Sequence, residues 1–432
     1  MAGPLVPPKP REGGPTLRNP WWVVLGATIG LTVANGPVVF FTFGLFLGPV
    51  TSEFGWDRAT FASSLLVGHT LAALAYPFMG RWIDRYGIRR ITLTFIPLFA
   101  LSTAAISLTP ASPVAFIALA GLCGLISTGQ APPAYAKVVS AWFDERRGLA
   151  LGIAMAGIGI GATLVPQFAR LMIDAYGWRA AYVALGVLTF AVAFPAVAVF
   201  IREPERQGSD PLTRRDSGGL TPPAPLPGIT LRESMRSSSF WLMALAVFLV
   251  VTTINGIVAH LVPLLTDRGL DVRQATATLS LVGLSTIAGR LVAGYLLDRF
   301  FAPYVAAGLF LLPLVAVALL TAGAGGVAPT LAAVSLGFGL GAEVDVIGFL
   351  AGRYFGLRAF GQIYGCLFAI FTLGTGLGPV LMAVSFDVTR SYDVTLTGFG
   401  VALVCASLLV SRLGPYPFPA RRAIPDRTVL PA

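Results

Sequence analysis

The chain has 432 residues, of which 55% are hydrophobic and only 12% are charged, with a formal net charge of +10 at pH 7. Soluble domains carry about 25% charged residues, so this composition excludes a protein whose whole surface faces water. A positive charge would also suit a nucleic-acid-binding protein, but in a membrane protein the position of basic residues matters more than their sum. We expect a lipid bilayer as the partner of this chain, and no nucleic acid.

The first segment, residues 1–20, is polar. It contains Lys9, Arg11, Glu12 and several prolines. It lacks the short apolar core that a signal peptide requires, so we expect no cleaved signal. This segment is predicted to be a cytoplasmic N-terminal tail.

Blocks of mainly apolar residues follow this tail. Each has about 20 residues or more, the length that an α-helix needs to cross roughly 30 Å of hydrocarbon. The blocks lie near 22–48, 58–80, 91–109, 113–139, 148–170, 178–201, 238–265, 273–297, 303–321, 327–349, 359–385 and 393–412. The sequence therefore predicts an all-α integral membrane protein with twelve transmembrane helices, six in residues 21–201 and six in residues 238–412.

The basic residues are distributed unevenly between the two sides of the predicted membrane. With the N-terminus in the cytoplasm, most of the 30 Lys and Arg residues fall on the inner side. The outer side receives Arg58, Arg170, Arg179, Arg268, Arg273 and Arg390. This asymmetry follows the positive-inside rule and predicts that both termini are cytoplasmic. Because nearly all basic residues are arginine, which is typical of GC-rich bacterial genomes, we expect the inner (plasma) membrane of a bacterium.

The longest internal polar stretch, residues 202–237, separates the two groups of six helices. It contains Arg214, Arg215, two adjacent glycines and several prolines. Such a composition cannot bury enough apolar surface to fold alone, so it predicts a flexible cytoplasmic linker. Residues 413–432 are predicted to form a cytoplasmic C-terminal tail.

The two groups of helices carry related motifs. Gly80-Arg-Trp-Ile-Asp84-Arg85 follows the second span, and Gly294-Tyr-Leu-Leu-Asp298-Arg299 follows the eighth, half a chain later. Pro166 and Pro379 are related by nearly the same offset. Similar elements at a constant offset indicate a duplicated chain with two pseudo-symmetric bundles. In transporters built this way, the substrate site lies near the bilayer midplane where the two halves meet.

The first of these motifs is part of a longer pattern. Gly80-Arg-Trp-Ile-Asp84-Arg85-Tyr-Gly87-Ile-Arg89-Arg90 resembles the G-x-x-x-D-R-x-G-x-R-R loop between helices 2 and 3 of the major facilitator superfamily. The resemblance covers residues 20–412 and implies two six-helix bundles that rock about a central site. It also implies a cytoplasmic gating loop, formed by Gly80, Asp84, Arg85, Gly87, Arg89, Arg90, Asp298 and Arg299.

The residue types of this loop suit a gate. Gly80 would let two helices approach closely, and Asp84 would face the positive N-terminal end of a neighbouring helix. Arg85 and Arg89 would pair with carboxylates. The alternative is that the arginines only set the topology, which explains the charges but neither Asp84 nor the glycines.

A narrower resemblance concerns the segments around the fifth and tenth spans. Residues 142–154, Trp-Phe-Asp-Glu-Arg-Arg-Gly-Leu-Ala-Leu-Gly-Ile-Ala, resemble the monocarboxylate transporter and oxalate/formate antiporter group. Gly341-Ala-Glu343-Val-Asp345 and the segments that begin at Arg353 and Phe360 are similar to bacterial members of the same group. This resemblance implies gradient-driven transport of a small organic anion.

Arg290 lies within the eighth span, eight residues or about 12 Å before Asp298 at the inner end. A guanidinium at this depth costs at least a few kcal/mol, so it should face the protein interior and hold an anion. The resemblance implies the same role, because in the monocarboxylate and oxalate transporters an arginine before this Gly-x-x-x-Asp element contacts the substrate carboxylate. The alternative is an internal ion pair with Glu343 or Asp345.

The sequence departs from its models at the other charged positions. The oxalate exchanger has a lysine in helix 11, but residues 360–386 contain neither Lys nor Arg. Animal monocarboxylate transporters have a lysine in helix 1, which is absent here, and an aspartate at the place of Thr286. One fixed cation favours a singly charged anion and leaves the coupling ion open.

Further polar residues lie within the predicted spans. Glu343 and Asp345 are two residues apart, so they point about 200° away from one another on a helix, and either could bind a coupling proton or neutralise Arg290. His69 and His260 are the two histidines and could titrate near neutral pH, although a structural histidine is the more common case.

Gln130 occupies the place that corresponds to Glu343 in the repeat, and Tyr135 follows it in the fourth span. We regard both as candidates for substrate binding. For Tyr135, the alternative is ordinary helix packing.

Other function classes are excluded or disfavoured by what the sequence lacks. Cys123, Cys366 and Cys405 each lie alone in an apolar block, so we expect neither a disulfide nor a metal site. No lysine follows a glycine as in a P-loop, which excludes an ATP-driven pump, and no convergent nucleophile or acid/base cluster indicates an enzyme. We expect no cofactor.

The sequence therefore predicts a secondary transporter that works by alternating access and functions as a monomer. Its substrate is a small organic anion, a monocarboxylate, carried by proton symport or anion exchange. One alternative is an exporter of hydrophobic or drug-like compounds by proton antiport, which the deep Arg290 disfavours. Another is a solute receptor that does not transport, for which we find no signalling domain.

Overall fold

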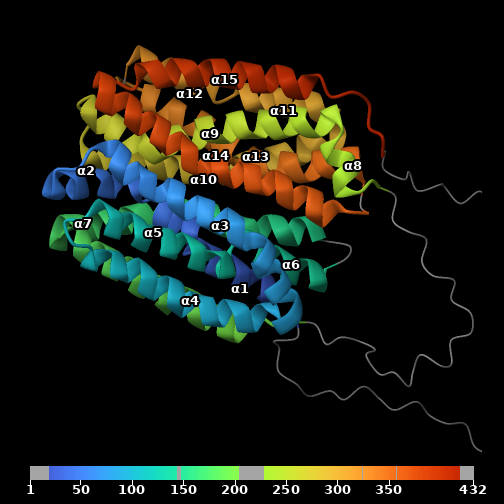
Figure 1. Cartoon of the computed structure of the whole chain (residues 1–432), viewed down its shortest axis with the longest axis horizontal. Coiled ribbons are helices and arrows are strands. Elements are labelled where there is room, and N and C mark those ends of the chain that lie inside the picture. The colour runs from blue at the N-terminus through green and yellow to red at the C-terminus, as the bar shows by residue number, and fades with distance from the viewer. Residues whose placement is uncertain (1–18, 144–146, 204–227, 324, 357, 419–432) are drawn as a thin grey trace, which may run out of the picture.

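The structure is a computed structural model that describes residues 19–143, 147–203, 228–323, 325–356 and 358–418. These residues form helices and connecting turns, with one isolated β-bridge between Gly228 and Gly356. Figure 1 shows the helices lying side by side, with the N-terminal half below and the C-terminal half above. We call the end of the bundle where α1 begins and α15 ends the terminal end, and the opposite one the far end.

The helices of the N-terminal half are α1 (Trp21–Thr32), the π-helix η2 (Gly36–Phe40), α2 (Phe43–Phe54), α3 (Arg58–Tyr86), α4 (Ile88–Ala105), η3 (Ile106–Leu108), α5 (Pro113–Ser127), η4 (Thr128–Gln130), α6 (Pro132–Trp142) and α7 (Arg147–Phe200). Those of the C-terminal half are α8 (Leu231–Met235), α9 (Ser238–Asp267), α10 (Val272–Arg299), α11 (Ala302–Leu311), α12 (Leu314–Ala322), α13 (Ala328–Phe355), α14 (Phe360–Thr389) and α15 (Asp393–Ser411).

The described helices provide twelve membrane crossings. Eleven helical segments are long and apolar enough to cross a membrane, and one of them, Leu149–Phe200, has 52 residues. That is more than twice the roughly 20 residues that one crossing requires. Gly177 interrupts this segment with a non-helical backbone (φ 81°, ψ 169°), so α7 crosses twice. The predicted all-α fold with twelve transmembrane helices is confirmed.

Proline residues divide several of the predicted spans. The first crossing runs from Trp21 to Phe54, further than the predicted 22–48, and η2, which carries Pro37, separates α1 from α2. Pro313 stands between α11 and α12. Because proline lacks an N–H and clashes with the preceding turn, a helix bends or ends there, and hydropathy does not register such a break.

The two halves meet along two pairs of helices that correspond in the repeat. Helix α3 of the N-terminal half packs against α14 of the C-terminal half. The first part of α7 packs against α10 in the same way. A Cβ added to Gly283 of α10 would lie 2.7 Å from backbone atoms of Ala162 and Thr163 in α7. On the other side, a Cβ on Gly376 of α14 would lie 3.0 Å from Cα of Leu66. Small residues therefore let the halves touch backbone to backbone.

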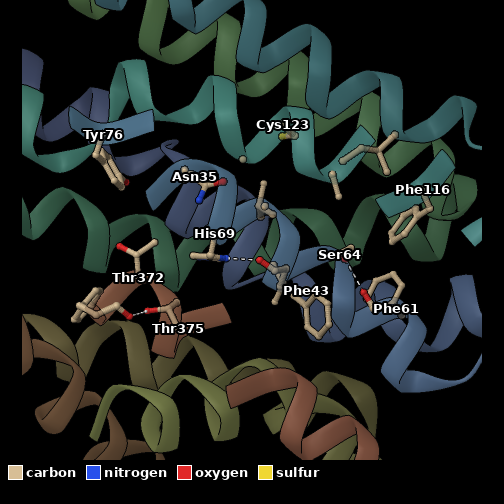
Figure 2. A pocket seen from close by; sticks show the side chains of 18 of the residues that line it. Asn35, Phe43, Phe61, Ser64, His69, Tyr76, Phe116, Cys123, Thr372 and Thr375 are labelled. Carbon is tan, nitrogen blue, oxygen red and sulfur yellow. Dashed lines mark hydrogen bonds between the residues drawn. The ribbon is translucent and has the colours of Figure 1, made fainter. Parts of the chain in front are cut away.

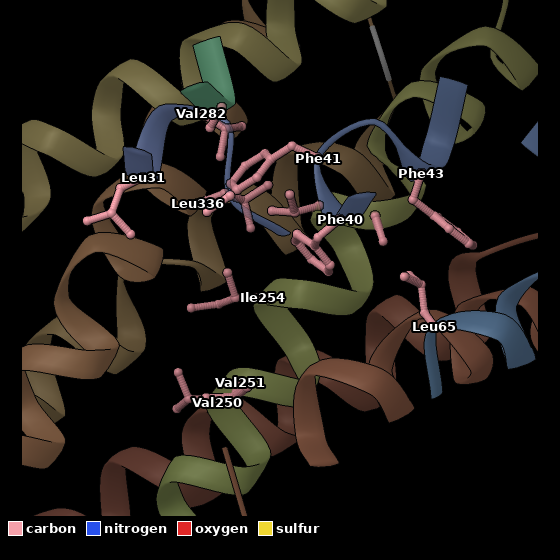
Figure 3. Packing of buried hydrophobic residues seen from close by; sticks show 14 of the residues in the cluster. Leu31, Phe40, Phe41, Phe43, Leu65, Val250, Val251, Ile254, Val282 and Leu336 are labelled. Atoms are coloured by element: carbon pink, nitrogen blue, oxygen red, sulfur yellow. The ribbon is translucent and has the colours of Figure 1, made fainter. Parts of the chain in front are cut away.

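Buried apolar side chains fill the space between the halves. One cluster contains residues from both of them, and Figure 3 shows Leu31, Phe40 and Phe41 of the N-terminal half together with Val282 and Leu336 of the C-terminal half. Large apolar side chains also lie exposed on the outside of many helices, as at Leu74, Leu101, Val114, Leu164 and Leu291. Such a surface is stable in contact with lipid.

The predicted linker, 202–237, lies largely outside the described residues, but its last part is folded. Gly228 bridges to Gly356, and Ile229 donates a backbone hydrogen bond to Phe355 at the end of α13. Thr230 and Glu233 form a capping box at the start of α8. The hydrogen bonds from Thr230 hold the pKa of the Glu233 carboxyl below its usual value. The chain is therefore fixed to the terminal end before α9 begins.

Candidate functional site

At the far end, Arg58 joins the two halves. It stands at the first position of α3, and its guanidinium donates to both carboxylate oxygens of Asp267 in α9, at 2.6 Å and 3.1 Å. The same guanidinium donates to the Tyr392 hydroxyl and lies 3.6 Å from the centre of the Phe386 ring. A bidentate ion pair covered by an aromatic ring is a strong form of the interaction.

A second contact at this end uses the start of α3 itself. The backbone N–H groups of Arg58 and Ala59 donate to the carboxylate of Asp387 in α14, at 3.1 Å and 2.7 Å. A carboxylate at a helix N-terminus satisfies unpaired N–H groups and interacts favourably with the helix dipole. We call Arg58, Asp267, Phe386, Asp387 and Tyr392 the far-end latch, because together they hold the halves closed there.

At the terminal end, the predicted gating loop makes its contacts within the N-terminal half. Gly87 has a φ of +84°, and a Cβ at this position would collide with the carboxylate of Glu203. The backbone N–H of Arg89 donates to Glu203 at 3.4 Å, and its guanidinium donates to the carbonyl of Ala198 at 2.7 Å. Arg89 thus binds a carbonyl rather than the carboxylate that we expected.

The other loop residues are not brought together. A Cβ on Gly80 would meet no atom within 4 Å, so the expected close approach is not present in this conformation. Arg85 lies over the ring of its neighbour Tyr86, and Arg299 over the ring of Tyr295.

Arg90 and Asp298 are exposed, and the side chain of Asp84 lies outside the described part of the structure. No ion pair between two described residues joins the halves at this end.

Arg290 forms a loose ion pair with Asp345. Gly341 lets α13 approach α10 closely, because a Cβ there would press on the backbone N of Arg290, at 2.8 Å. One turn further along α13, Asp345 Oδ2 lies 3.5 Å from Arg290 Nε, and the two side chains are 15% and 33% exposed. Charge-assisted hydrogen bonds are normally about 2.7–2.9 Å long. Of the alternatives that the sequence left open for an internal pair, this structure contains the one with Asp345.

Arg290 also faces the boundary between the halves. It lines a cavity of about 190 Å³ between α7 and α10, together with Gly152, Met155, Gly159 and Thr286. Beyond this cavity, towards the far end, the Ser280 hydroxyl donates to the Thr163 carbonyl at 2.7 Å and closes the α7–α10 interface. The Arg290–Asp345 pair therefore lies beside a cavity at the boundary of the halves, on the terminal-end side of this hydrogen bond.

Glu343 lies on the opposite face of α13 from Asp345, as a spacing of two residues requires. It is only 3% exposed, and Asn255 Nδ2 of α9 donates to its Oε1 at 3.4 Å. Its other oxygen has no hydrogen-bond partner among the described residues. The two carboxylates thus belong to different sites.

A second cavity, of about 170 Å³, lies mainly within the N-terminal half, where α3 and α5 line it, and α14 of the C-terminal half closes one side. We call it the central cavity and define it by His69 and Tyr76 of α3 and by Phe368, Phe371, Thr372 and Thr375 of α14. Figure 2 shows Asn35, His69 and Thr372 among the residues that line it. Among the described residues that line this cavity, His69 is the one that the sequence predicted as a site residue.

The remaining candidates lie elsewhere. Tyr135 is fully buried, and its hydroxyl packs against Gly30 of α1. Gln130 is buried in η4, and its amide has no hydrogen-bond partner among the described residues. His260 is buried behind the far-end latch, with Nδ1 3.5 Å from the Tyr392 hydroxyl. None of these three lines either cavity.

Sequence reasoning missed the far-end latch and Asn255. Arg58 was assigned only to the outer set of basic residues, and the acidic partners are more than 200 residues away in the sequence. The available signal was the presence of opposite charges at the outer ends of spans in both halves.

Comparisons with known proteins agree on one family. A family model described as Major Facilitator Superfamily matches residues 29–379. Similar curated proteins include the uncharacterized MFS-type transporter YcxA of Bacillus subtilis, 26% identical over 60% of this chain and 60% of that protein. Monocarboxylate transporter 13 of Bos taurus is 26% identical over 90% of this chain and 87% of that protein.

The human Monocarboxylate transporter 11 is 28% identical over 63% of this chain and 57% of its own length. The chain thus spans less than two thirds of some of these relatives. Among solved structures, a bacterial homolog of the human lysosomal transporter Spinster, in an inward-facing and occupied conformation, matches with a TM-score of 0.66. It is 17% identical and covers 92% of this chain and 95% of its own, so this likeness concerns the fold.

Proposed function

The chain belongs to the Major Facilitator Superfamily, a family of transporters rather than enzymes, and on that premise we propose that it carries a small monocarboxylate by alternating access. The named relatives that are monocarboxylate transporters support this substrate class. The proposal places the protein, as a monomer, in the inner membrane of a bacterium with both termini in the cytoplasm. The terminal end would then face the cytoplasm.

The Arg290–Asp345 pair is the observation that carries the proposal. At 3.5 Å and partly exposed, it is loose enough for a substrate carboxylate to replace Asp345 at the guanidinium. Asp345, released into a partly buried position without its cation, would then bind a proton. One anion and one proton would thus enter together and leave the charge of the site unchanged. This favours proton symport over anion exchange.

The same pair explains how an empty carrier could return. A deep guanidinium without an anion is costly to enclose between two closing bundles. With Asp345 as its partner, the charge is neutralised, so the halves can close without substrate. Substrate and Asp345 would therefore alternate at Arg290 during each cycle.

Uptake of labelled lactate, formate and oxalate into proteoliposomes tests the proposal. We expect accumulation of the two monocarboxylates under an inward proton gradient, and little uptake of oxalate. In Asp345→Asn, gradient-driven accumulation should be lost while exchange against internal lactate continues. Uptake that depends only on internal anion would establish an exchanger instead, and no uptake of any acid would refute the proposed substrate class.

A second candidate function, proton-coupled export of hydrophobic compounds, is favoured by one observation. Glu343 is a buried carboxyl group that has no cation within ion-pairing distance among the described residues, and it could carry the proton of an antiport cycle. This function predicts that dye efflux from proteoliposomes requires Glu343 and is indifferent to Arg290. Loss of efflux in Glu343→Gln together with normal efflux in Arg290→Gln would favour it.

A further inference from the structure

A column of aromatic rings runs along one face of α14. Phe360, Tyr364, Phe368 and Phe371 are four, four and three residues apart, so they lie on the same side of the helix. Successive ring centres are 5.7, 5.9 and 5.2 Å apart, and the planes are inclined by only 16°, 23° and 9°. The face is thus a continuous stack, which ends in the wall of the central cavity.

The start of the column lies beside the Arg290–Asp345 pair. Tyr364 packs on α13 at Gly348, where an added Cβ would be 3.7 Å from the tyrosine ring. Gly348 is three residues after Asp345 and therefore on the same face of α13. An apolar surface thus leads from the ion pair at one end to the central cavity at the other.

The size and lining of the central cavity fit one aromatic ring. Its volume is about 170 Å³, and a protein cavity of roughly 150 Å³ with an apolar lining is known to bind benzene. Phe368 and Phe371 form one wall, Tyr76 meets Phe368 edge to face at 5.7 Å, and Phe43 and Phe61 line the side towards the far end. Because a cavity of roughly 150 Å³ holds one ring, a volume of about 170 Å³ leaves little free space for a second fused ring.

His69 provides a polar partner inside this apolar space. Its Nδ1 lies 2.8 Å from the carbonyl of Leu65. A carbonyl only accepts hydrogen bonds, so Nδ1 carries the hydrogen and the lone pair of the neutral ring lies on Nε2. Within the described residues, Nε2 has no hydrogen-bond partner. The amide of Asn35, also on the wall, makes no hydrogen bond with another described residue and can donate.

The other titratable groups on the wall are Tyr76, Tyr182 and Cys123, and no Asp, Glu, Lys or Arg among the described residues lines the cavity. His69 is therefore the group on this wall whose free ring nitrogen can accept a proton. A carboxylate that entered alone would be a lone buried charge, which is costly. With a proton shared between it and Nε2, the pair is neutral.

We propose that the central cavity binds a single-ring aromatic monocarboxylic acid together with one proton. The ring stacks on the Phe368–Phe371 wall, and the carboxyl group meets His69 Nε2 and the Asn35 amide. While the acid occupies this cavity, Arg290 is paired with Asp345 as in this structure, so the single proton that enters and leaves with the anion lies between the carboxyl oxygen and Nε2. This inference rests on the proposed function, because it assigns the aromatic members of the monocarboxylate class as the preferred substrates.

Binding of labelled benzoate to the purified full-length protein, and competition by benzoate against labelled lactate in proteoliposomes, test the proposal. Benzoate and phenylacetate should compete at concentrations at least about tenfold lower than acetate, since each buries a ring, whereas 2-naphthoate should lack this advantage. Benzoate affinity should fall as pH rises, by up to about tenfold per pH unit above the titration of the imidazole.

Two variants with matched controls separate the parts of the proposal. Ala72→Leu, which fills the cavity, should abolish the preference for benzoate over acetate. Leu74 lies on the same helix with its side chain 64% exposed, so Leu74→Phe should keep the preference for benzoate. His69→Gln should remove the pH dependence of benzoate binding, and His260→Gln should retain it.

The outcomes also distinguish this proposal from the one on which it rests. If benzoate competes no better than acetate while lactate uptake still requires Arg290, the cavity assignment is overturned and the carrier function stands. If lactate uptake is absent or independent of Arg290, the proposed function itself fails. A benzoate preference that survives Ala72→Leu would place the ring elsewhere and would also overturn the inference.

Discussion

Two of the arginine–aspartate pairs that the structure describes share their chemistry but differ in geometry and position. Arg58 and Asp267 join the two halves through two short hydrogen bonds under an aromatic ring. Arg290 and Asp345 belong to the same half and meet through a single 3.5 Å contact beside a cavity. The comparison teaches that pairs of the same chemistry can be held very differently: the tight pair joins the two halves, and the loose pair leaves Arg290 Nε without a hydrogen-bond partner among the described residues.

The largest effect is expected from removing the cation of the loose pair. Arg290→Gln should reduce monocarboxylate uptake by about a hundredfold or more, because it removes the charged, partly buried group that we propose binds the substrate carboxylate. Arg290→Lys, which keeps the charge but not the planar fork, should fall in between. Initial rates in proteoliposomes, with melting curves to verify folding, measure this. Uptake within about twofold of the parent protein would contradict it.

A smaller effect is expected at the tight pair, and it concerns conformation rather than chemistry. Arg58→Gln removes the bidentate contact and should shift the population towards a state that is open at the far end, by about tenfold. Electron-paramagnetic distance measurements between labels at Ser52 and Val388, with the three native cysteines replaced, would detect longer distances. An unchanged distance distribution would show that Asp387 and the apolar contacts suffice.

Exchanging the charges sharpens the contrast between the pairs. Arg58→Asp combined with Asp267→Arg restores the ion pair across the halves and should recover much of the closed population. Arg290→Asp combined with Asp345→Arg also restores a pair but moves the cation from α10 to α13, so uptake should stay at least about tenfold reduced. Recovery of uptake in this second double variant would mean that the position of the guanidinium is unimportant.

The smallest effect belongs to the gating loop at the terminal end. Gly87→Ala places a side chain at a φ of +84° and against Glu203, and should lower the free energy of unfolding by about 1–2 kcal/mol. Gly80→Ala is its matched control, because the added methyl group would meet nothing within 4 Å. Thermal melting of both variants measures the difference. Equal melting temperatures would contradict the structural role of Gly87.

The sequence predicted the parts of this molecule that depend on local patterns. Hydropathy predicted the twelve crossings, because each must be apolar over a fixed length. The depth of Arg290 in its span predicted that it needs an anion, and Asp345 was one of the two internal partners considered. Helical spacing alone required Glu343 to lie on another face.

What the sequence could not predict depends on which helices pack together. The far-end latch combines a helix start, two helix ends and a turn from distant parts of the chain. In the sequence, each of its charged residues resembles an ordinary charged residue of a loop. The central cavity is lined by several helices of the N-terminal half and by α14, so His69 could be named but its neighbours could not. The contacts of Gly80 depend on the conformation, and here the halves do not meet at that residue.

The cap that Asp387 provides for α3 has a consequence for kinetics. Whenever the halves part at the far end, the backbone N–H groups of Arg58 and Ala59 lose their acceptor from α14 and become open to water. Their exchange with deuterium therefore reports the fraction of time that this end is open or, where exchange is faster than closing, how often it opens. Two amides of the parent chain, without any label, would report opening of the far end and its change when substrate is added.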